Sequence, residues 1–367
     1  MKEVSIEEFT SKQQTLNTTR NYKSHLNGYF EHIGTRPPEY FSSNRDYDED
    51  FKDYAQHIKN MSLCTRKMKL TVIKTYLRKN KILLDDETLI ETIKPVKMRK
   101  QTTDEVPTPA ILKEILDHGT TKDRALFLFL SSSGVRVGEA LKLTKEDIPA
   151  FKQLEQNKPV ETPIKVRLSA RITKTHLPRT TYISQEAWHM LLEWLKERDA
   201  YIDQAARKSK YYKDHKDDRL FPHGYSSASA SWNRLVRNSK HDDKDQNSKG
   251  KEYQRRVYHI HMLRAYFKNR MIDANVQERW IEIMLGHIGY VGGAYDKSLD
   301  SQIQKAYEKG EASLSIYEIP PDMSSVKEDL KQKDAEISKM RAEMSEMKLK
   351  LLELTLTKLD KQVNGDK

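Results

Sequence analysis

A buried helix is the sequence feature that most constrains how this chain folds. Residues 125–130 read ALFLFL, an uninterrupted apolar run, and SSSG follows directly at 131–134. A helix that is apolar on every side has no face for solvent, so other elements must surround it. The Ser-Gly step then ends the helix, and VGEALKL at 137–143 starts a short second one. The sequence therefore predicts a sizeable domain centred on this helix.

The other residues of 110–319 predict further helices and a small antiparallel sheet. PIKVRLSA alternates apolar with polar residues over 164–168, which is typical of a strand, and TTYIS at 180–184 is its expected hairpin partner. Helical spacing recurs in EAWHMLLEWLKER (186–198) and in HMLRAYFKNRMIDA (261–274). The residues expected to face the core in these two helices are Trp188, Leu191, Leu192, Leu195, Leu263, Phe267 and Met271.

Composition divides the chain into four predicted regions. Residues 1–98 read as a helical domain, and 99–109 read as a linker, because this stretch is polar, carries prolines and lacks apolar periodicity. Residues 110–319 form the larger, mixed α/β domain, and 320–367 form a tail. The predicted fold class is mainly α with a small antiparallel sheet.

The tail has a heptad pattern that predicts a coiled coil and a helix partner for it. The tail residues that recur at seven-residue intervals are Leu330, Ile337, Met344 and Leu351, interleaved with Met340, Met347 and Leu354. A single long solvated helix is the alternative interpretation.

Charge points to a polyanionic partner. The chain has a net charge of +11 and a pI near 9.3, which favours nucleic acid, although a merely soluble basic protein is the alternative. Residues 54–84 contain no acidic side chain, and an amphipathic helix with only positive charge on its polar side suits a DNA backbone. The basic residues predicted to bind DNA are Lys59, Arg66, Lys67, Lys69, Lys74, Arg78, Lys79 and Lys81.

Several classes of protein fit this sequence poorly. Cys64 is the single cysteine, so an intrachain disulfide and a cysteine zinc cluster are excluded, and a reducing setting is the default. The longest apolar runs fall short of the roughly 20 residues of a membrane span. The first residues, MKEVSIEEFTSK, carry no apolar core of signal-peptide length. We therefore expect a soluble, cytoplasmic protein.

Residues suited to phosphate chemistry occur at separated places in the larger domain. Arg136 starts the second helix, with Glu139 on the same face. In HIHMLR, His261 and Arg264 lie three apart. Arg264 is surrounded by apolar residues, where a half-buried guanidinium needs an anion from the fold or from a ligand. His287 follows a predicted helix that ends in glycine.

Taken in order, these residues resemble the tyrosine recombinase (phage-type integrase) family. The match runs through GVRVGEALKL, ITKTHLPRTTYI, HMLRAYF, LGH and a final tyrosine, and spans nearly all of residues 110–300. The resemblance implies a SAM-like core-binding domain at 1–98 and a catalytic domain at 110–319. It further implies that the two domains clamp double-stranded DNA, and that four protomers assemble on paired sites.

The resemblance also implies a reaction. A tyrosine attacks the scissile phosphate, which gives a 3′-phosphotyrosyl link and a free 5′-hydroxyl without ATP, cofactor or metal. Arg136 and Arg264 match the arginines that hold the phosphate oxygens, a task that suits guanidinium groups. His261 and His287 are expected to add hydrogen bonds to the same oxygens or to move protons.

Two more residues receive roles from the resemblance. Lys174, in ITKTH, matches the hairpin lysine that protonates the leaving 5′-oxygen, and a plain surface lysine is the alternative. Glu139 matches the acidic helper that orients Arg136 or a histidine. The family often has a second histidine after the second arginine, where this chain has Ala265.

The expected nucleophile is Tyr295, in the glycine-rich stretch LGHIGYVGGAYDKS at 285–298. Glycines loosen the backbone, which suits a nucleophile that must swing toward DNA. Tyr295 stands eight residues after His287, where the family usually has nine. Tyr290 is the competitor, and a third hypothesis makes Tyr307 or Tyr317 the nucleophile.

Other functions share these residues. The alternatives are a chromosome dimer resolvase, a type IB topoisomerase-like nicking-closing enzyme, a non-enzymatic DNA-binding protein and a structural coiled-coil protein. The long tail and the insertion at 199–256 favour the integrase of a mobile element, and the lysine-rich, cysteine-poor composition fits an archaeal or bacterial source. His259 and His261 form a weak metal-binding pattern, and we expect no metal.

Overall fold

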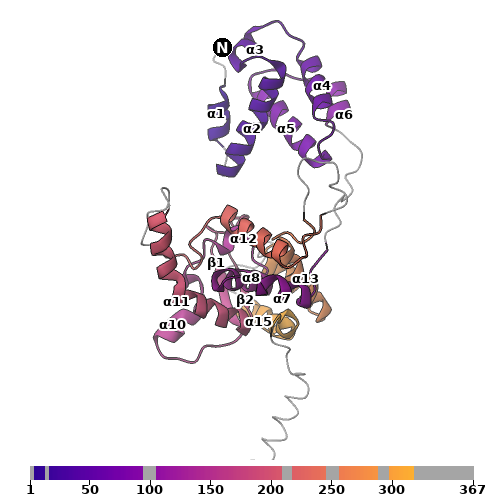
Figure 1. Cartoon of the computed structure of the whole chain (residues 1–367). Coiled ribbons are helices and arrows are strands. Elements are labelled where there is room, and N and C mark those ends of the chain that lie inside the picture. The colour runs from indigo at the N-terminus through magenta and orange to yellow at the C-terminus, as the bar shows by residue number, and fades with distance from the viewer. Residues whose placement is uncertain are drawn as a thin grey trace, which may run out of the picture. The chain divides into compact units, whose positions relative to one another are not determined.

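The structure is a computed structural model, and it describes residues 4–12, 16–93, 105–208, 217–244, 256–287 and 297–317. The chain divides into two compact units, Met1–Gln101 and Thr102–Lys367 (Figure 1). Each unit has its own hydrophobic core. The predicted coiled coil lies outside the described residues, and so does most of the predicted linker.

The first unit is helical throughout its described part. Its elements are α1 (Ile6–Ser11), α2 (Leu16–Ile33), α3 (Pro37–Ser42), α4 (Tyr47–His57), α5 (Leu63–Lys79) and α6 (Asp86–Thr92). Oxygen side chains begin the later helices: Asp46, Ser62 and Asp85 each accept backbone N–H bonds at the start of α4, α5 and α6. Such caps satisfy donors that the first helical turn leaves without partners.

Aromatic side chains fill much of the core of the first unit. Tyr29 and Tyr40 are fully buried, and their hydroxyl groups lie 2.7 Å apart, so each polar tip has a partner. From α5, Leu70, Ile73 and Leu77 are fully buried, as the helical periodicity predicts. The inward face of α5 is thus apolar, and its lysines and arginines occupy the remaining surface of the helix.

The second unit combines helices with a hairpin, which confirms the predicted fold class. Its elements are α7 (Pro109–Asp117), α8 (Thr121–Ser133), α9 (Val137–Ala140), η1 (Lys145–Asp147), α10 (Ala150–Glu155), β1 (Ile164–Leu168), β2 (Arg179–Ile183), α11 (Gln185–Lys208), α12 (Tyr225–Asn238), α13 (Met262–Asp273), α14 (Glu278–Leu285), α15 (Lys297–Glu311) and η3 (Ala312–Leu314).

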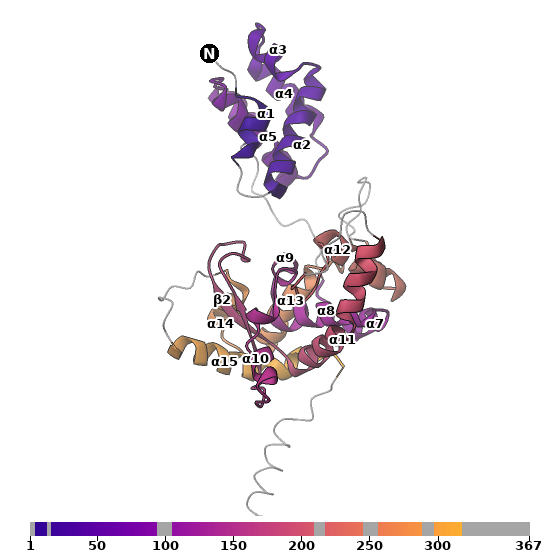
Figure 2. The same cartoon turned by 90° about the vertical axis from the view of Figure 1, so that its left-hand side faces the viewer.

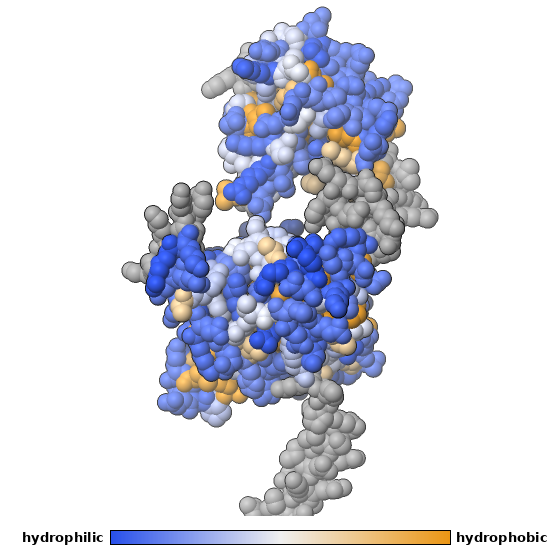
Figure 3. Space-filling view, in the orientation of Figure 1, coloured by the Kyte–Doolittle hydropathy of each residue, from blue (hydrophilic) through white to orange (hydrophobic). Residues whose placement is uncertain are grey.

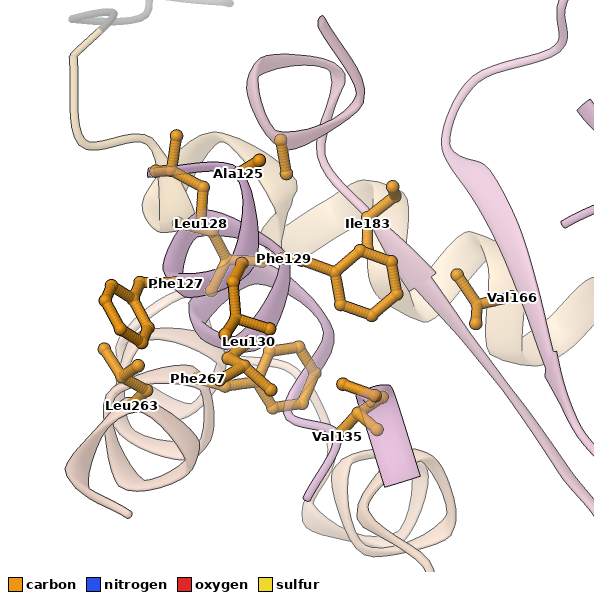
Figure 4. Close-up of a cluster of buried hydrophobic side chains, with 14 of the residues drawn as sticks. Ala125, Phe127, Leu128, Phe129, Leu130, Val135, Val166, Ile183, Leu263 and Phe267 are labelled. Atoms are coloured by element: carbon orange, nitrogen blue, oxygen red, sulfur yellow. The ribbon is translucent and has the colours of Figure 1, made fainter. Parts of the chain in front are cut away.

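Helix α8 is the centre of the second unit. Every residue from 125 to 133 is buried, which confirms the prediction drawn from the apolar run. Figure 4 shows Leu263 and Phe267 of α13 on one side of α8, and Val166 and Ile183 of the hairpin on another. Helix α11 packs along α8 as well. A helix surrounded in this way fixes the position of whatever follows its C-terminus.

The hairpin pairs β1 with β2 in antiparallel register, with Ile164 opposite Ile183 and Leu168 opposite Arg179. Thr181 donates to the carbonyl of Ser133 at 2.9 Å and thereby ties β2 to the end of α8. Helices α14 and α15 also contact β2, and Figure 2 shows both beside the hairpin. The hairpin therefore joins the end of α8 to the end of α14.

Helix α15 is anchored at two points. Lys165 of β1 forms an ion pair with Asp300 at 2.6 Å. The hydroxyl of Tyr307, a fully buried residue, donates to the carbonyl of Ser132 at 2.9 Å.

Helix α11 differs from its prediction in two ways. Leu192 and Leu195 pack against the core as predicted but are only partly buried, whereas Trp194, which was not predicted to face the core, is buried and donates to the carbonyl of Leu220 at 2.9 Å. The indole has a polar edge that this carbonyl satisfies, so burial of the larger ring is favoured. The helix also runs to Lys208 rather than ending near residue 198, so part of the predicted insertion is helical.

The surface that Figure 3 shows is mainly hydrophilic, with small scattered apolar patches. Among the residues that the structure describes, none forms a helix long and apolar enough to cross a membrane.

Candidate active site

Arg136 is presented by the break between α8 and α9. Gly134 has a φ of 65°, and a Cβ there would lie 2.5 Å from the Phe267 ring, so the turn requires glycine. Arg136 then begins α9 and donates through its backbone N–H to Glu139 at 3.2 Å and through Nη1 to the same carboxylate at 3.1 Å. The predicted contact between these two residues is therefore present.

An arginine that the sequence analysis did not single out is the main partner of Glu139. Arg179 opens β2, and its Nη2 donates to Glu139 Oε2 at 2.5 Å while Nε donates to the carbonyl of Met284 at 3.1 Å. Both charged side chains are only 3% exposed. Burial raises the pKa of Glu139, but bonds from Arg179 and Arg136 outweigh it and leave that pKa below its ordinary value. The buried carboxylate is thus held ionised.

Strand alternation could have revealed Arg179. In the hairpin register, Arg179, Thr181 and Ile183 lie opposite Leu168, Val166 and Ile164, so all six share one face of the sheet. That face is apolar and buried, and a charged residue on it needs a charged partner.

Arg264 is buried in α13 and is held by neutral groups. Nη1 donates to the carbonyl of Gly134 at 2.5 Å, Nη2 donates to the carbonyl of Leu285, and Nη2 also lies 2.9 Å from His287 Nε2. Burial, followed by the nearby charges of Arg136 and Arg179, lowers the pKa of Arg264 to about 9. A guanidinium in this setting gains stability from an anion.

His287 follows α14 and faces this arginine. Gly286, with a φ of 71°, ends the helix as predicted. The Nδ1 of His287 lies 2.6 Å from Glu282 Oε2. A Cβ on Gly286 would lie 2.8 Å from Arg179 Cδ, so this turn packs directly on the buried arginine.

Two more predicted residues lie on the surface of the second unit. Lys174 is exposed, and its backbone N–H donates to Glu139 Oε1 at 3.3 Å, so the hairpin tip starts beside the buried carboxylate. His261 is exposed and immediately precedes α13, and its ring is nearly parallel to that of His259 with 6.4 Å between centroids. Within the described ranges, no three His, Cys, Asp or Glu side chains are grouped so as to hold a metal ion.

Three arginines and a histidine therefore converge from four elements. The carboxylate of Glu139 neutralises part of this charge, whereas the hydrogen-bond partners that the structure describes for Arg264 include no carboxylate. A phosphodiester matches such a site because its two non-bridging oxygens accept hydrogen bonds from guanidinium groups.

The sequence profile described as "Phage integrase family" matches residues 101–290, which is 190 of the 367 residues and just over half of the chain. The chain belongs to the phage integrase family. It is therefore a site-specific recombinase of the tyrosine type, as the order of its motifs predicts. The matched range includes every residue of the cluster described above.

Solved structures of integrases share the fold. A fragment of the Tn1549 transposon integrase in complex with a circular-intermediate DNA aligns with a TM-score of 0.52 and 16% identity, over 83% of this chain and 99% of that chain. The lambda integrase tetramer bound to a Holliday junction aligns with a TM-score of 0.50 and 13% identity, over 80% and 77%. The comparison with curated protein sequences gave no match.

The structure of this integrase-family chain describes two of the four candidate tyrosine nucleophiles. Tyr295 and Tyr290 lie outside the described residues. Tyr307 is fully buried with its hydroxyl on a carbonyl, and burial raises its pKa well above the ordinary value. Burial also raises the pKa of Tyr317. A nucleophile needs access and an ionisable hydroxyl, so burial argues against the third hypothesis, more strongly for Tyr307 than for Tyr317.

The basic residues predicted to bind DNA lie on and around α5 of the first unit. Those that are exposed are Lys59, Lys67, Arg78, Lys79 and Lys81, and those that are partly buried are Arg66, Lys69 and Lys74.

Proposed function

We propose that the protein integrates and excises a mobile DNA element through a 3′-phosphotyrosyl intermediate. The observation that carries this proposal is the environment of Arg264. This guanidinium is buried, and the hydrogen-bond partners that the structure describes for it are two carbonyls and an imidazole. The guanidinium of Arg264 can therefore still accept an anionic ligand, and Arg136 lies close enough to lower the pKa of Arg264. A scissile phosphate between the two arginines supplies the missing anion.

The proposed roles follow from what each side chain offers. Arg136 and Arg264 donate to the non-bridging oxygens, whose negative charge grows as the phosphorus becomes five-coordinate. His261 and His287 are proposed to donate hydrogen bonds to the same oxygens or to move protons. Tyr295 attacks, so that its oxygen bonds to phosphorus as the bond from phosphorus to the 5′-oxygen breaks.

Lys174 is proposed to give its proton to the departing 5′-oxygen. Its exposure in the connection between β1 and β2 suits this role, because an exposed lysine can reach a bound duplex without a change in the core. The nearby bond from its backbone N–H to Glu139 keeps the tip close to the arginines.

Double-stranded DNA and further copies of the chain are the proposed partners. The structural neighbours include an integrase bound to DNA and an integrase tetramer on a Holliday junction, which supports assembly of this chain on paired sites. The basic side chains around α5 are proposed to contact the DNA backbone. We place the protein in the cytoplasm, on chromosomal and element DNA, and we propose that the tail binds a partner helix. Sedimentation of the full chain and of a chain ending at residue 321 tests the role of the tail.

Covalent trapping on DNA tests the proposal. The protein is mixed with fragmented host and element DNA, stopped with detergent, and the attached DNA is sequenced. We expect adducts with the wild type and with Tyr290→Phe, and none with Tyr295→Phe. Adducts that persist in Tyr295→Phe would assign the nucleophile elsewhere, and DNA binding without any adduct would favour the non-enzymatic alternative. Relaxation of supercoiled plasmid lacking the recovered site would favour a nicking-closing enzyme.

A further inference from the structure

Glu282 holds His287 by two separate bonds. The backbone N–H of His287 donates to the carbonyl of Glu282 at 3.0 Å, while Gly286 N–H donates to the carbonyl of Ile283 at 2.9 Å. These two bonds are the Schellman arrangement that follows from a left-handed glycine after a helix. The arrangement places His287, the residue after the glycine, next to Glu282, five positions earlier in the chain. The imidazole thereby meets the Glu282 side chain, with 2.6 Å between Nδ1 and Oε2.

The contacts of the imidazole decide which nitrogen carries its proton. A guanidinium has only donors, so Arg264 Nη2 at 2.9 Å requires a lone pair on His287 Nε2. The hydrogen of the neutral ring is therefore on Nδ1, where a carboxylate accepts it. Both neighbours of the ring thus require the same tautomer.

Lys268 keeps Glu282 in place and ionised. Its Nζ donates to Glu282 at 2.6 Å and to Glu278 at 3.1 Å. The side chain of Glu282 is 15% exposed, and burial raises its pKa, but the bonds from Lys268 and His287 lower that pKa below the ordinary value. Lys268 stands one turn after Arg264 on α13, so this single helix supplies the phosphate-binding arginine and the lysine that fixes the carboxylate.

We propose that Glu282 is a positioning residue of the recombination reaction. It fixes the ring of His287 and places the proton on Nδ1, so that Nε2 points at Arg264 and at the phosphate expected there. A carboxylate behind an imidazole also stabilises the imidazolium that forms whenever Nε2 takes a proton. This inference rests on the proposed function for its catalytic meaning, but the tautomer is a property of the free protein.

Nitrogen-15 NMR of the full chain, labelled at histidine, tests the proposal without DNA. Spectra are recorded at a pH where the imidazole is neutral, and the His287 signals are assigned by their loss in His287→Gln. We expect the wild type to carry hydrogen on Nδ1. Glu282→Leu leaves only Arg264 to favour this tautomer, so we expect the Nδ1–H fraction to fall in that variant. Glu282→Gln should retain this tautomer, because an amide carbonyl also accepts from Nδ1. Glu278→Leu is the matched control, since Glu278 shares Lys268 but is not the carboxylate bonded to His287.

Covalent-adduct formation is then measured in the same variants. Loss of a group that orients a reacting side chain typically costs about 10- to 100-fold. We expect Glu282→Leu to be slower by this factor and to cause no further loss in the His287→Gln background, and we expect Glu278→Leu to keep the wild-type rate. An unchanged His287 tautomer in Glu282→Leu would overturn the proposal, and so would equal slowing by Glu278→Leu. The expected tautomers without any wild-type adduct would instead leave Glu282 as the positioning group and refute the recombinase mechanism.

Discussion

Replacing Arg179 by methionine should destabilise the second unit by about 3 kcal/mol. Removing one member of a buried ion pair costs about 3–5 kcal/mol, because the other charge loses its partner. Glu139 would keep the Arg136 guanidinium at 3.1 Å and two backbone N–H donors at 3.2 and 3.3 Å. We therefore expect a cost near the lower end of that range, although the carbonyl of Met284 also loses a donor.

Tryptophan fluorescence measures this loss in the full chain. All four tryptophans, at 188, 194, 232 and 280, belong to the second unit, so their emission reports its unfolding alone. With a urea dependence of about 2–3 kcal/mol per molar, a loss of about 3 kcal/mol lowers the urea midpoint by about 1 M. Arg167→Met is the matched control, because Arg167 is exposed on the neighbouring strand, and we expect it to change stability by less than about 0.5 kcal/mol.

A double-mutant cycle with Glu139→Gln separates the ion pair from simple loss of packing. If the pair is responsible, Arg179→Met costs at least about 1 kcal/mol less in the Glu139→Gln background than in the wild type. Strictly additive losses, or a loss below about 1 kcal/mol for Arg179→Met alone, would refute the assignment of Arg179 as the group that holds Glu139.

Three further outcomes are expected. Gly286→Ala should lower the stability of the second unit by about 1–3 kcal/mol and slow adduct formation, because the new Cβ strains a left-handed residue and clashes with Arg179. Gly138→Ala is the control: Gly138 has open space around it, so we expect unchanged stability and an unchanged rate of adduct formation. Lys174→Ala should slow cleavage by about 10²–10⁴-fold on ordinary DNA. A substrate with sulfur at the bridging 5′ position, whose leaving group needs no proton, should restore the rate of this variant. Continued slowing on that substrate would show that Lys174 is not the general acid. Because its folded pKa is lowered, Glu139 should stabilise the second unit fully above the ordinary value of 4.5 and lose this effect as the pH falls through the folded pKa; urea midpoints should therefore fall less on acidification in Glu139→Gln than in the wild type.

The sequence predicted those site residues whose placement depends on local pattern. The apolar run of α8, its glycine end and the arginine after it are all neighbours in the chain, and backbone sterics relate one to the next. Arg264 was recognisable because a charged residue among apolar ones on a helix must be buried. These features need no knowledge of which elements pack together.

Residues that act across elements were missed. Arg179 meets Glu139 and Met284 only because β2 packs against both α9 and α14, and the sequence does not fix that packing. Glu282 was within reach of sequence reasoning, because a left-handed glycine places His287 over the residue five positions earlier. Leu192 and Leu195 face the core as predicted but are only partly buried, and buried Trp194 was missed, because helical spacing does not reveal how wide the buried face is.

The anchoring of α15 bears on whether a subunit cuts DNA with its own tyrosine or with that of a neighbouring subunit. His287 and Lys297 are separated by ten chain steps, a reach of at most about 35 Å from end to end, and α14 and α15 on either side both pack in the second unit. The hydroxyl of Tyr307 holds α15 against the carbonyl of Ser132 in the same subunit. We therefore expect a nucleophile between His287 and α15 to serve the arginines of its own chain. Mixing a subunit that lacks Arg264 with one that lacks Tyr295 should then restore no cutting, since neither kind of subunit carries a complete set.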